Sequence, residues 1–504
     1  MQISTIKVLF RCNKNVILRH VKTYTYILMN RYFLLLIISV VFASCCTTQT
    51  SVKESDQKIT PIVLPAPDRP SGQADVIALT APKLETVRVG FIGLGMRGPG
   101  AVQRFTFIDG IKVIALCDIH PDRVERCQKI LKNAGMPEAV GYSGDKEVWK
   151  KLCDRDDIDL VYICTDWKSH AQMAIYAMEK GKHVVSEVPI SITLDDCWQL
   201  VNTAEKTRKH CMMLENCCYD FYEMATLNMA QKGLLGELVH AEGAYIHDLR
   251  SLNFLDPKDG GYNEWWRLEM NIQHDGNYYS THGLGPVCQA LNIGRGDRMK
   301  YLVSLSSDQF GMTAYAKEKF GTDSEMAKQT YAKGDMNTTL IKTEKGKSIM
   351  IQHDVTSARP YNRKHALSGT KGYIEKYPRP GIALDPSEAI AAKYGNLGAH
   401  GFVSKEIHDQ LMKEYEHPIT KEVGELARKV GGHGGMDFIM DYRLIYCLRN
   451  GLPLDMNVYD GVEWSSIGPL TELSVKNNSA PVAMPDFTRG SWKKLNGYSH
   501  AFVK

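Results

Sequence analysis

The chain lacks a hydrophobic run long enough to span a bilayer, an excess of charge of one sign, and a dense, even set of cysteines. Its longest apolar stretch, Phe33–Ala43, has 11 residues, whereas a membrane-spanning helix needs about 20. The 61 basic and 57 acidic side chains give a formal charge of +4, too little to attract nucleic acid. The 13 cysteines are scattered over 504 residues, unlike the disulfide framework of a small secreted domain. We therefore expect no transmembrane helix and no nucleic-acid partner.

Motifs typical of metal sites and of repeat folds are absent as well. The sequence contains no HExxH motif and no pair of CxxC motifs. His433, in the segment GGHGG, has no metal-ligand spacing around it, so we interpret it as a loop histidine and predict no metal. No internal period typical of a solenoid or propeller is present.

The short apolar run resembles an export signal. Met29-Asn30-Arg31 precede it and Ser44-Cys45-Cys46 follow it. The order basic, apolar, small residues and cysteine is that of a bacterial lipoprotein signal peptide. This resemblance implies a lipid on Cys45 or Cys46, with cleavage without lipidation as the alternative. We interpret residues 1–46 as a doubtful start and a signal peptide, and expect an exported protein, lipid-anchored in the periplasm or at the cell surface.

Residues 47–86 are rich in Thr, Ser, Gln and Pro and show no sustained period of 2 or 3.6. Such a composition is typical of a flexible tether. The rest of the chain is long enough for two domains, which we place at 87–216 and 217–504.

The first domain opens with a nucleotide-binding pattern. A short apolar strand runs into the G-x-G-x-x-G motif of Gly93, Gly95 and Gly98, and a second strand, Lys112–Cys117, ends at Asp118. The glycines allow a tight turn and a close approach to a pyrophosphate at a helix N-terminus. The spacing therefore predicts a dinucleotide-binding fold.

Asp118 also indicates which dinucleotide is bound. A carboxylate at this position binds the ribose hydroxyls and repels a 2′-phosphate, so NAD is favoured over NADP. Arg97 is the residue that could accommodate a 2′-phosphate if it lay close to the ribose.

Apolar strands and helical segments alternate further along this domain. Ile158–Cys164 and His183–Glu187 read as strands and Ser169–Lys180 as a helix, a pattern that predicts a doubly wound parallel sheet. Ligands bind such sheets beyond the carboxyl ends of the strands. The polar segments at those ends are Thr165–His170, Glu187–Pro189 and Glu215-Asn216.

The second domain has a different pattern. Tyr219–Leu234 is typical of a helix, and five later segments are typical of strands: Glu237–Leu249, Tyr301–Ser307, Thr338–Thr343, Ser348–Thr356 and Lys371–Lys376. The predicted fold class is α/β: an N-terminal Rossmann domain with a doubly wound parallel sheet, and a C-terminal α+β domain with an open, largely antiparallel sheet. We expect the helix Gly435–Asn450 and the tail to pack back against the first domain.

The motifs GLGMRG, ALCD, TDWKSH, GKHVVSEVP and MLEN resemble the glucose–fructose oxidoreductase and inositol dehydrogenase superfamily. That superfamily normally has a Glu-Lys-Pro motif, whose lysine helps to handle the substrate hydroxyl proton. Here the triplet is Glu187-Val188-Pro189, and valine has no proton to exchange. This departure counts against an ordinary sugar dehydrogenase.

Within that superfamily the chain resembles glycoside hydrolase family 109. The motifs that carry this resemblance are Trp167-x-x-His170, Glu187-Val188-Pro189, Tyr245-x-His247, Tyr279–Pro286 and Gly296-Asp297-Arg298. Known members are NAD-dependent α-N-acetylgalactosaminidases. The resemblance covers Val87 to the C-terminus. Position 280 departs from it, because this chain has Ser280 where the family usually has proline.

The resemblance implies a set of binding residues. The implied cofactor contacts, besides Gly93, Gly95 and Gly98, are Met96, Arg97, Asp118, Trp167, His170, Glu187, Val188 and Asn216. The implied substrate contacts are Tyr245, Arg267, Tyr279, Ser280, Thr281, His282 and Tyr361. The substrate is then a glycan or small molecule that ends in N-acetylgalactosamine.

The catalytic hypothesis follows from what a bound hydride acceptor allows. Hydride leaves C3 of the sugar for NAD, the C2 proton becomes acidic, the aglycone leaves, water adds at C1, and the hydride returns, with retention of configuration. We expect Tyr245 to be the base at C2, and His282 or His247 to handle the C3 hydroxyl proton. The alternatives are an NAD-dependent sugar dehydrogenase and a non-catalytic sugar-binding lipoprotein, and a homo-oligomer stays open.

Overall fold

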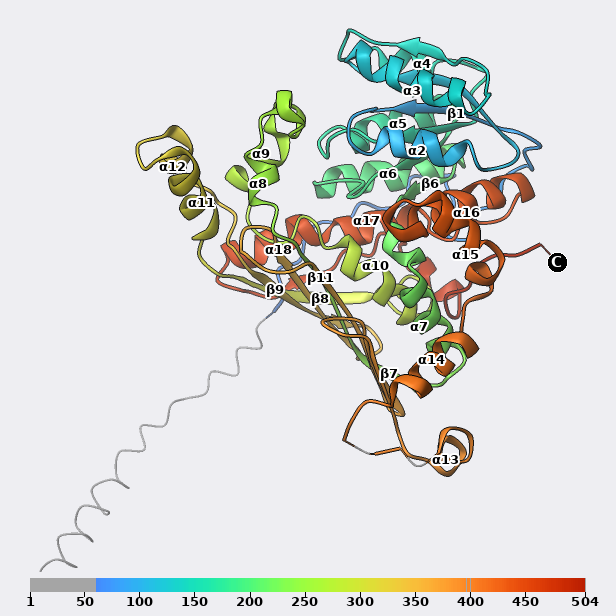
Figure 1. The fold of residues 1–504 in the computed structure, drawn as a ribbon, viewed down its shortest axis with the longest axis vertical. Helices are drawn as coiled ribbons and strands as arrows, with labels where there is room; N and C mark the ends of the chain where they lie inside the picture. Colours follow the sequence, from blue (N-terminus) through green and yellow to red (C-terminus); the bar gives the residue numbers. More distant parts are fainter. Residues whose placement is uncertain (1–59, 396, 399, 504) are drawn as a thin grey trace, which may run out of the picture. The chain divides into compact units, whose positions relative to one another are not determined.

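The structure is a computed structural model that describes residues 60–395, 397–398 and 400–503. The chain from Thr60 onward forms one compact unit (Figure 1). The signal peptide, Cys45, Cys46 and tether residues 47–59 lie outside the described residues. Within the described ranges, no helix combines the length and apolar character needed to cross a bilayer.

The first domain is built on a six-stranded sheet in the order β3-β2-β1-β4-β5-β6, with every pair of strands parallel. Its strands are β1 (Val87–Ile92), β2 (Ile111–Cys117), β3 (Val140–Tyr142), β4 (Leu160–Ile163), β5 (His183–Ser186) and β6 (Cys211–Met213). Its helices are α2 (Gly98–Phe105), α3 (Pro121–Asn133), α4 (Trp149–Cys153), α5 (His170–Glu179) and α6 (Leu194–Thr207). The strand order reverses between β1 and β4, and a crevice at such a switch point is where this fold binds ligands. The predicted doubly wound parallel sheet is confirmed.

Apolar strands buried on both faces explain why this sheet forms. All residues of β4 and β5 are buried, as expected for strands that are covered by helices on both sides. Phe91 of β1 packs against Phe105 and Tyr162, with ring centroids 5.1 Å away in each case. These contacts fix α2, and with it the glycine loop, on the sheet.

The second domain contains an eight-stranded sheet in the order β13-β12-β11-β7-β10-β9-β8-β14. Its strands are β7 (Leu238–Ile246), β8 (Met299–Ser306), β9 (Asn337–Thr343), β10 (Ser348–Asp354), β11 (Asn362–Gly369), β12 (Gly372–Glu375), β13 (Gly381–Leu384) and β14 (Val482–Ala483). The β10–β7 pair is parallel and the other pairs are antiparallel, which confirms the predicted open, largely antiparallel sheet. Strands β11, β13 and β14 were not predicted.

Helices cover one face of this sheet (Figure 1). Helices α10 and α18 contact β7 and β8. The helices of this domain are α7 (Phe221–Gln231), α8 (Arg250–Asn253), α9 (Trp266–Gln273), α10 (Thr281–Ala290), α11 (Gly311–Phe320), α12 (Glu325–Lys328), α13 (Glu388–Tyr394), α14 (Lys405–Glu414), α15 (Pro418–Val430), α16 (Met436–Asn450), α17 (Val458–Ser465) and α18 (Ile467–Lys476). Short 3₁₀ turns are η1 (Asn216–Tyr219), η2 (Pro257–Asp259), η3 (Asn263–Trp265), η4 (His433–Gly435) and η5 (Ser491–Lys494).

Helix α16 belongs to the second domain by sequence but packs on the first. Asp441 of α16 accepts hydrogen bonds from Nε of Arg104 at 2.7 Å and from the hydroxyl of Tyr162 at 3.0 Å. Both partners lie in the nucleotide-binding domain, on α2 and β4. The C-terminal part of the chain therefore stabilises α2, the helix that follows the glycine loop.

Residues 60–86 are docked on the folded chain, so the expectation of a flexible tether is wrong for this part. Arg69 pairs with the buried carboxylate of Glu205 at 3.0 Å, and the backbone N–H of Val76 donates to the hydroxyl of Tyr459 at 3.1 Å. Val76 and Ile77 are buried. Isolated apolar residues in a polar segment show no period, and this is why the composition did not indicate docking.

Candidate active site

The glycine loop has the shape that a dinucleotide requires. Gly93 has φ +88°, and a Cβ there would lie 2.6 Å from the carbonyl carbon of Cys164. A Cβ on Gly98 would lie 2.2 Å from the Gly93 oxygen. At Gly95, by contrast, the nearest atom to a Cβ is Nη1 of Arg123 at 3.4 Å. Gly93 and Gly98 are therefore required by packing, whereas Gly95 leaves the loop open to a pyrophosphate, so these residues fit NAD.

Asp118 stands at the end of β2, as predicted, and is joined to the glycine loop. Its Oδ2 accepts a hydrogen bond from the backbone N–H of Leu94 at 2.7 Å. Its Oδ1 accepts a hydrogen bond from the backbone N–H of His120 at 2.9 Å. Nη1 of Arg123 lies 3.4 Å from Oδ1. The carboxylate is thus held at the edge of the loop, where a ribose would bind.

Arg97 does not lie beside Asp118, which corrects the idea that it could accommodate a 2′-phosphate there. Its Nε donates to Oε1 of Glu187 at 2.9 Å, and its Nη2 donates to Oδ2 of Asp437 at 3.2 Å. Glu187 above all, together with Asp437, raises the pKa of Arg97. These buried carboxylates draw the guanidinium toward the β5 end of the sheet, and Arg123 is the arginine next to Asp118.

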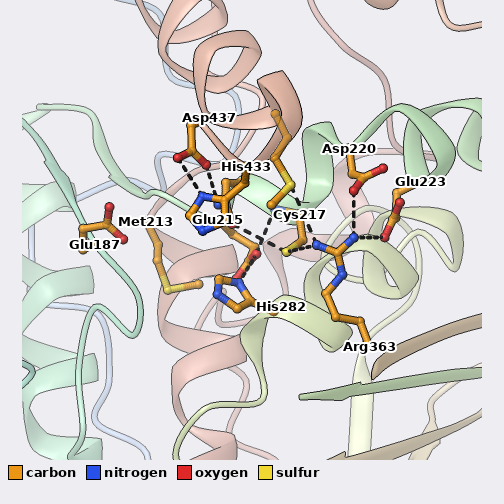
Figure 2. A network of polar contacts seen from close by, with 12 residues as sticks. Glu187, Met213, Glu215, Cys217, Asp220, Glu223, His282, Arg363, His433 and Asp437 are labelled. Atoms are coloured by element: carbon orange, nitrogen blue, oxygen red, sulfur yellow. Dashed lines mark hydrogen bonds and ion pairs between the residues drawn. The ribbon is translucent and has the colours of Figure 1, made fainter. Parts of the chain in front are cut away.

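Asp437, at the start of α16, connects the predicted cofactor residues to the second domain (Figure 2). Its Oδ2 lies 2.9 Å from Nδ1 of His433, and its Oδ1 accepts a hydrogen bond from Nδ2 of Asn216 at 2.5 Å. Burial opposes ionisation of Asp437, but the contact with His433 and the charges of Arg97 and Arg104 lower its pKa. His433, interpreted from sequence as a loop histidine, is therefore part of a charged network.

Five of the predicted catalytic and substrate residues form one aromatic cluster. The hydroxyl of Tyr245 lies 3.0 Å from Nδ1 of His247. The Tyr245 ring centroid lies 4.6 Å from that of Tyr279, 5.4 Å from His282 and 6.1 Å from Tyr361. The first two residues lie at the end of β7, and the others come from the start of α10 and from the residue before β11. The fold thus brings together segments that are more than a hundred residues apart.

His282 is oriented by a buried carboxylate. Its Nδ1 lies 2.7 Å from Oε1 of Glu215, which is fully buried just before η1 (Figure 2). Burial raises the pKa of Glu215, but the charge of His282 and its hydrogen bond outweigh this effect and hold the pKa below its usual value. A carboxylate in this position fixes the orientation of the ring, as in other acid–base pairs.

Arg267 lies between aromatic rings at the boundary of the two domains. Its guanidinium carbon is 5.0 Å from the ring centroid of Trp167 and 4.6 Å from that of Tyr279. These two rings stack, with centroids 5.2 Å apart and planes at 16°. Nη1 donates to the hydroxyl of Tyr262 at 3.0 Å, whereas Nη2 has no partner among the described residues. A buried donor without a partner is costly, so Nη2 fits the predicted role of binding a substrate oxygen.

The surroundings of Tyr245 and His247 favour the neutral form of both side chains. Burial raises the pKa of Tyr245, and the charge of Arg267 opposes this rise. Burial and then the charge of Arg267 lower the pKa of His247. The hydroxyl and Nδ1 are close enough to share a proton, but both shifts oppose a lasting transfer from the phenol to the imidazole.

Of four other predicted binding residues, three are buried and one is exposed. His170 has Nδ1 2.7 Å from the Pro189 oxygen and Nε2 3.1 Å from the Thr165 oxygen, so a direct contact with NAD requires one of these bonds to break. Val188 is buried before a cis peptide bond. Met96 is 55% exposed on the glycine loop, and Thr281 Oγ1 has no partner within the described part of the chain.

The sequence does not predict a role for Asp437, Asp441 and Arg104. Their contacts link α16 to the glycine loop and to α2. One signal is present: Asp437 lies in the first turn of the predicted helix Gly435–Asn450, shortly after His433. A carboxylate in the first turn of a helix is common, and this position does not say which residue of the other domain it meets.

Both domains match models of known protein families. Residues 87–215 match the profile "Oxidoreductase family, NAD-binding Rossmann fold", and residues 219–494 match "Glycosyl hydrolase 109, C-terminal domain". The chain belongs to glycosyl hydrolase family 109. It is 56% identical over 453 residues to glycosyl hydrolase family 109 protein 1 of Bacteroides fragilis strain YCH46, covering 89% of this chain and 95% of that protein.

A second family 109 relative has a named activity. The α-N-acetylgalactosaminidase of Bacteroides fragilis strain ATCC 25285 is 55% identical over 424 residues, covering 84% of this chain and 97% of that protein. Among solved structures, a levoglucosan dehydrogenase in complex with NADH and levoglucosan has a TM-score of 0.57 at 17% identity, covering 80% of this chain and all of that one. The structural likeness shows the shared fold, and the first domain is an NAD-binding Rossmann domain.

Proposed function

We propose that this chain is an α-N-acetylgalactosaminidase that removes terminal α-linked N-acetylgalactosamine with a recycled NAD. The observation that carries the proposal is that Tyr245 lies 3.0 Å from His247, with its ring 5.4 Å from that of the Glu215-bound His282. This closeness supports a site in which a base and a hydroxyl-handling group act on the same sugar. The named relative at 55% identity supports the same activity.

The cofactor and the protein have separate tasks. Bound NAD supplies reversible hydride acceptance at C3 of the sugar. Asp118 and the loop of Gly93, Gly95 and Gly98 hold the dinucleotide, and Arg97 with Glu187 orders the strand ends beside it. The protein groups must then move protons at C2, at the C3 hydroxyl and at the attacking water.

Tyr245 is the base at C2 in this proposal. The C2 proton passes to the Tyr245 oxygen while the phenol proton passes to His247 through the 3.0 Å contact, so that no phenolate has to persist in the buried site. His282, oriented by Glu215, takes the proton of the C3 hydroxyl and later returns it. Arg267 Nη2 binds a sugar oxygen, and Tyr279 packs against the sugar ring.

The test uses an aryl α-N-acetylgalactosaminide and follows released aglycone and NADH absorbance together. We expect aglycone without net NADH. Stoichiometric NADH from free sugar would instead show a dehydrogenase, and binding without either product would show a sugar-binding protein. Tyr245→Phe should lower kcat by about 10²–10⁴-fold, and Phe254→Leu, in a separate apolar cluster, is the control for a change at a buried ring.

We also propose that the protein is exported and lipid-anchored through Cys45 or Cys46. The order of basic residues, apolar run, small residues and cysteine supports this proposal. Partition into detergent phase, lost on joint replacement of the two cysteines by alanine, is the expected result. Partition that is unchanged in the double variant would contradict it.

A homo-oligomer is proposed from the open face of the second sheet. Leu340 is 55% exposed there and pairs with Val303 on β8 and Met350 on β10. A row of apolar side chains on a sheet face favours burial against a second copy. Light scattering after size exclusion should give a multiple of the mass of the single chain measured under denaturing conditions.

A further inference from the structure

Three kinds of metal ligand meet in the catalytic site. Glu215 and Cys217 flank the start of η1, and His282 lies in the first turn of α10 (Figure 2). One ligand atom from each residue lies within 4.8 Å of the other two. Glu215 and Cys217 are fully buried, while the side chain of His282 is 13% exposed. A small cation could thus reach the group past His282.

One oxygen of Glu215 accepts no hydrogen bond of standard geometry within the described residues, although the hydroxyl of Thr281 also interacts with this carboxylate and helps to lower its pKa. Its Oε1 lies 2.7 Å from Nδ1 of His282 and accepts the backbone N–H of Cys217 at 3.1 Å. Its Oε2 is buried and has no hydrogen-bond partner within the described residues. A buried carboxylate oxygen without a partner is costly, and a cation next to it would remove that cost.

The charge that balances a divalent cation would come from the ligands themselves. Nη1 of Arg363 lies 2.8 Å from Sγ of Cys217, and its Nη2 pairs with Asp220 and Glu223 at 2.8 Å each. Lys376 pairs with the same two carboxylates. Burial and the charge of Asp220 raise the pKa of Glu223 to about 7, so these two acids offset the two bases only in part near pH 7. The carboxylate of Glu215 and a thiolate at Cys217 would together balance a charge of +2.

We propose that Glu215, Cys217 and His282 form an inhibitory site for Zn²⁺. Sulfur, nitrogen and oxygen ligands at about 2.0–2.3 Å in a tetrahedral arrangement are the set that Zn²⁺ prefers. On binding, the Cys217 thiol releases its proton to solvent, and His282 exchanges its contact with Glu215 for a bond to the metal. A water completes the fourth position on the exposed side of His282. Mg²⁺ and Ca²⁺ do not compete, because they favour oxygen ligands.

The inhibition follows from the role of His282. A ring nitrogen bound to Zn²⁺ cannot accept the proton of the C3 hydroxyl, and Glu215 no longer orients the ring. This part rests on the proposed function, whereas metal binding does not.

The test uses the full-length NAD-bound protein and Co²⁺ as a spectroscopic probe. A thiolate ligand gives Co²⁺ a charge-transfer band in the near ultraviolet, and we expect that band in the wild type and its loss on adding Zn²⁺. Cys217→Ser should abolish the band and weaken Zn²⁺ binding by at least about 100-fold, since even groups behind metal ligands change affinity by about 10–100-fold. Cys218→Ser is the matched control, because Cys218 is the adjacent buried free cysteine.

The outcomes distinguish the metal site itself from the inhibition that we attribute to it. No band in the wild type, or equal Zn²⁺ affinity in Cys217→Ser and wild type by calorimetry, would overturn the site. The thermal midpoint of each variant is measured alongside, and Cys217→Ala serves as the second variant if the serine variant fails to fold. Zn²⁺ binding that needs Cys217 but leaves aglycone release unchanged would support the metal site and contradict the role given to His282.

Discussion

Nδ1 of His282 lies 2.7 Å from Oε1 of Glu215, and this contact joins the second domain to the strand ends of the NAD-binding domain. His282 is at the start of α10, and Glu215 follows β6. The imidazole that we propose as the acceptor of the C3 hydroxyl proton is therefore held in place by a carboxylate of the other domain.

Glu215→Gln should lower kcat by about 10²-fold or more, because an amide cannot stabilise a charged imidazole as a carboxylate does. The rate of aglycone release at saturating aryl glycoside measures this change. Glu237→Gln, which alters an exposed carboxylate paired with Lys347, is the control. A kcat equal to wild type would show that the contact has no role in orienting His282.

Asp437→Asn should weaken NAD binding by about tenfold. The carboxylate binds Arg97 on the glycine loop and Asn216 in the predicted cofactor site, and a hydrogen bond to a charged group contributes about 1.5–3 kcal/mol. Calorimetric titration of the NAD-free protein gives the Kd. Asp409→Asn removes an exposed carboxylate that pairs with Lys405 and should leave the Kd unchanged. Equal Kd values for both variants would contradict the role of Asp437.

Ser280→Pro should be tolerated at a position where the chain departs from the expected family pattern. Ser280 has φ −70°, close to the value near −65° that proline requires, so the backbone already fits. Its hydroxyl donates to the Trp464 oxygen at 3.2 Å, and losing that bond costs about 1 kcal/mol. Ser280→Ala is the matched variant, with the same expected loss in thermal unfolding. A much larger loss for proline than for alanine would mean that the loop is strained by the ring.

Buried histidines should make the fold less stable in mild acid. Burial lowers the pKa of His183 to about 4 and that of His210 to about 3, and the two rings lie 5.0 Å apart. Below pH about 6.5 the unfolded chain binds a proton that folded His183 does not accept until about pH 4. The free energy of unfolding therefore falls as the pH drops through this window.

Urea unfolding at pH 7 and pH 5 measures this effect. His183 contributes about 2 kcal/mol of the loss at about 1.4 kcal/mol per pH unit. His183→Asn, whose amide oxygen can replace Nδ1 as acceptor for the backbone N–H of His210, should reduce the difference. His400→Asn, at an exposed position, should not. An unchanged difference in His183→Asn would contradict the assignment.

The sequence predicted the parts of the molecule that depend on local constraints. Gly93 and Gly98 are required by contacts within the β1–α2 turn and with the neighbouring strand, so a short motif identifies them. Tyr245 and His247 lie two residues apart at the end of one strand, and the family resemblance supplied their partners. The parallel and antiparallel sheets followed from periods of alternation.

The remaining features depend on contacts between distant segments. Arg97 and Asp437 are 340 positions apart, and nothing local to either residue predicts that they meet. The composition of residues 60–86 is typical of a tether and does not indicate docking, because burial of Val76 and Ile77 depends on surfaces formed by other elements. Cys217 joins Glu215 and His282 for the same reason, so no metal-ligand spacing was visible.

Removal of bound NAD is the most direct test of the proposed redox-assisted glycosidase. The protein is stripped of cofactor on charcoal, assayed with the aryl α-N-acetylgalactosaminide, and assayed again after NAD is added back. We expect aglycone release to fall to background and to return with NAD, with no net NADH formed. Release at the full rate by the stripped protein would contradict the account.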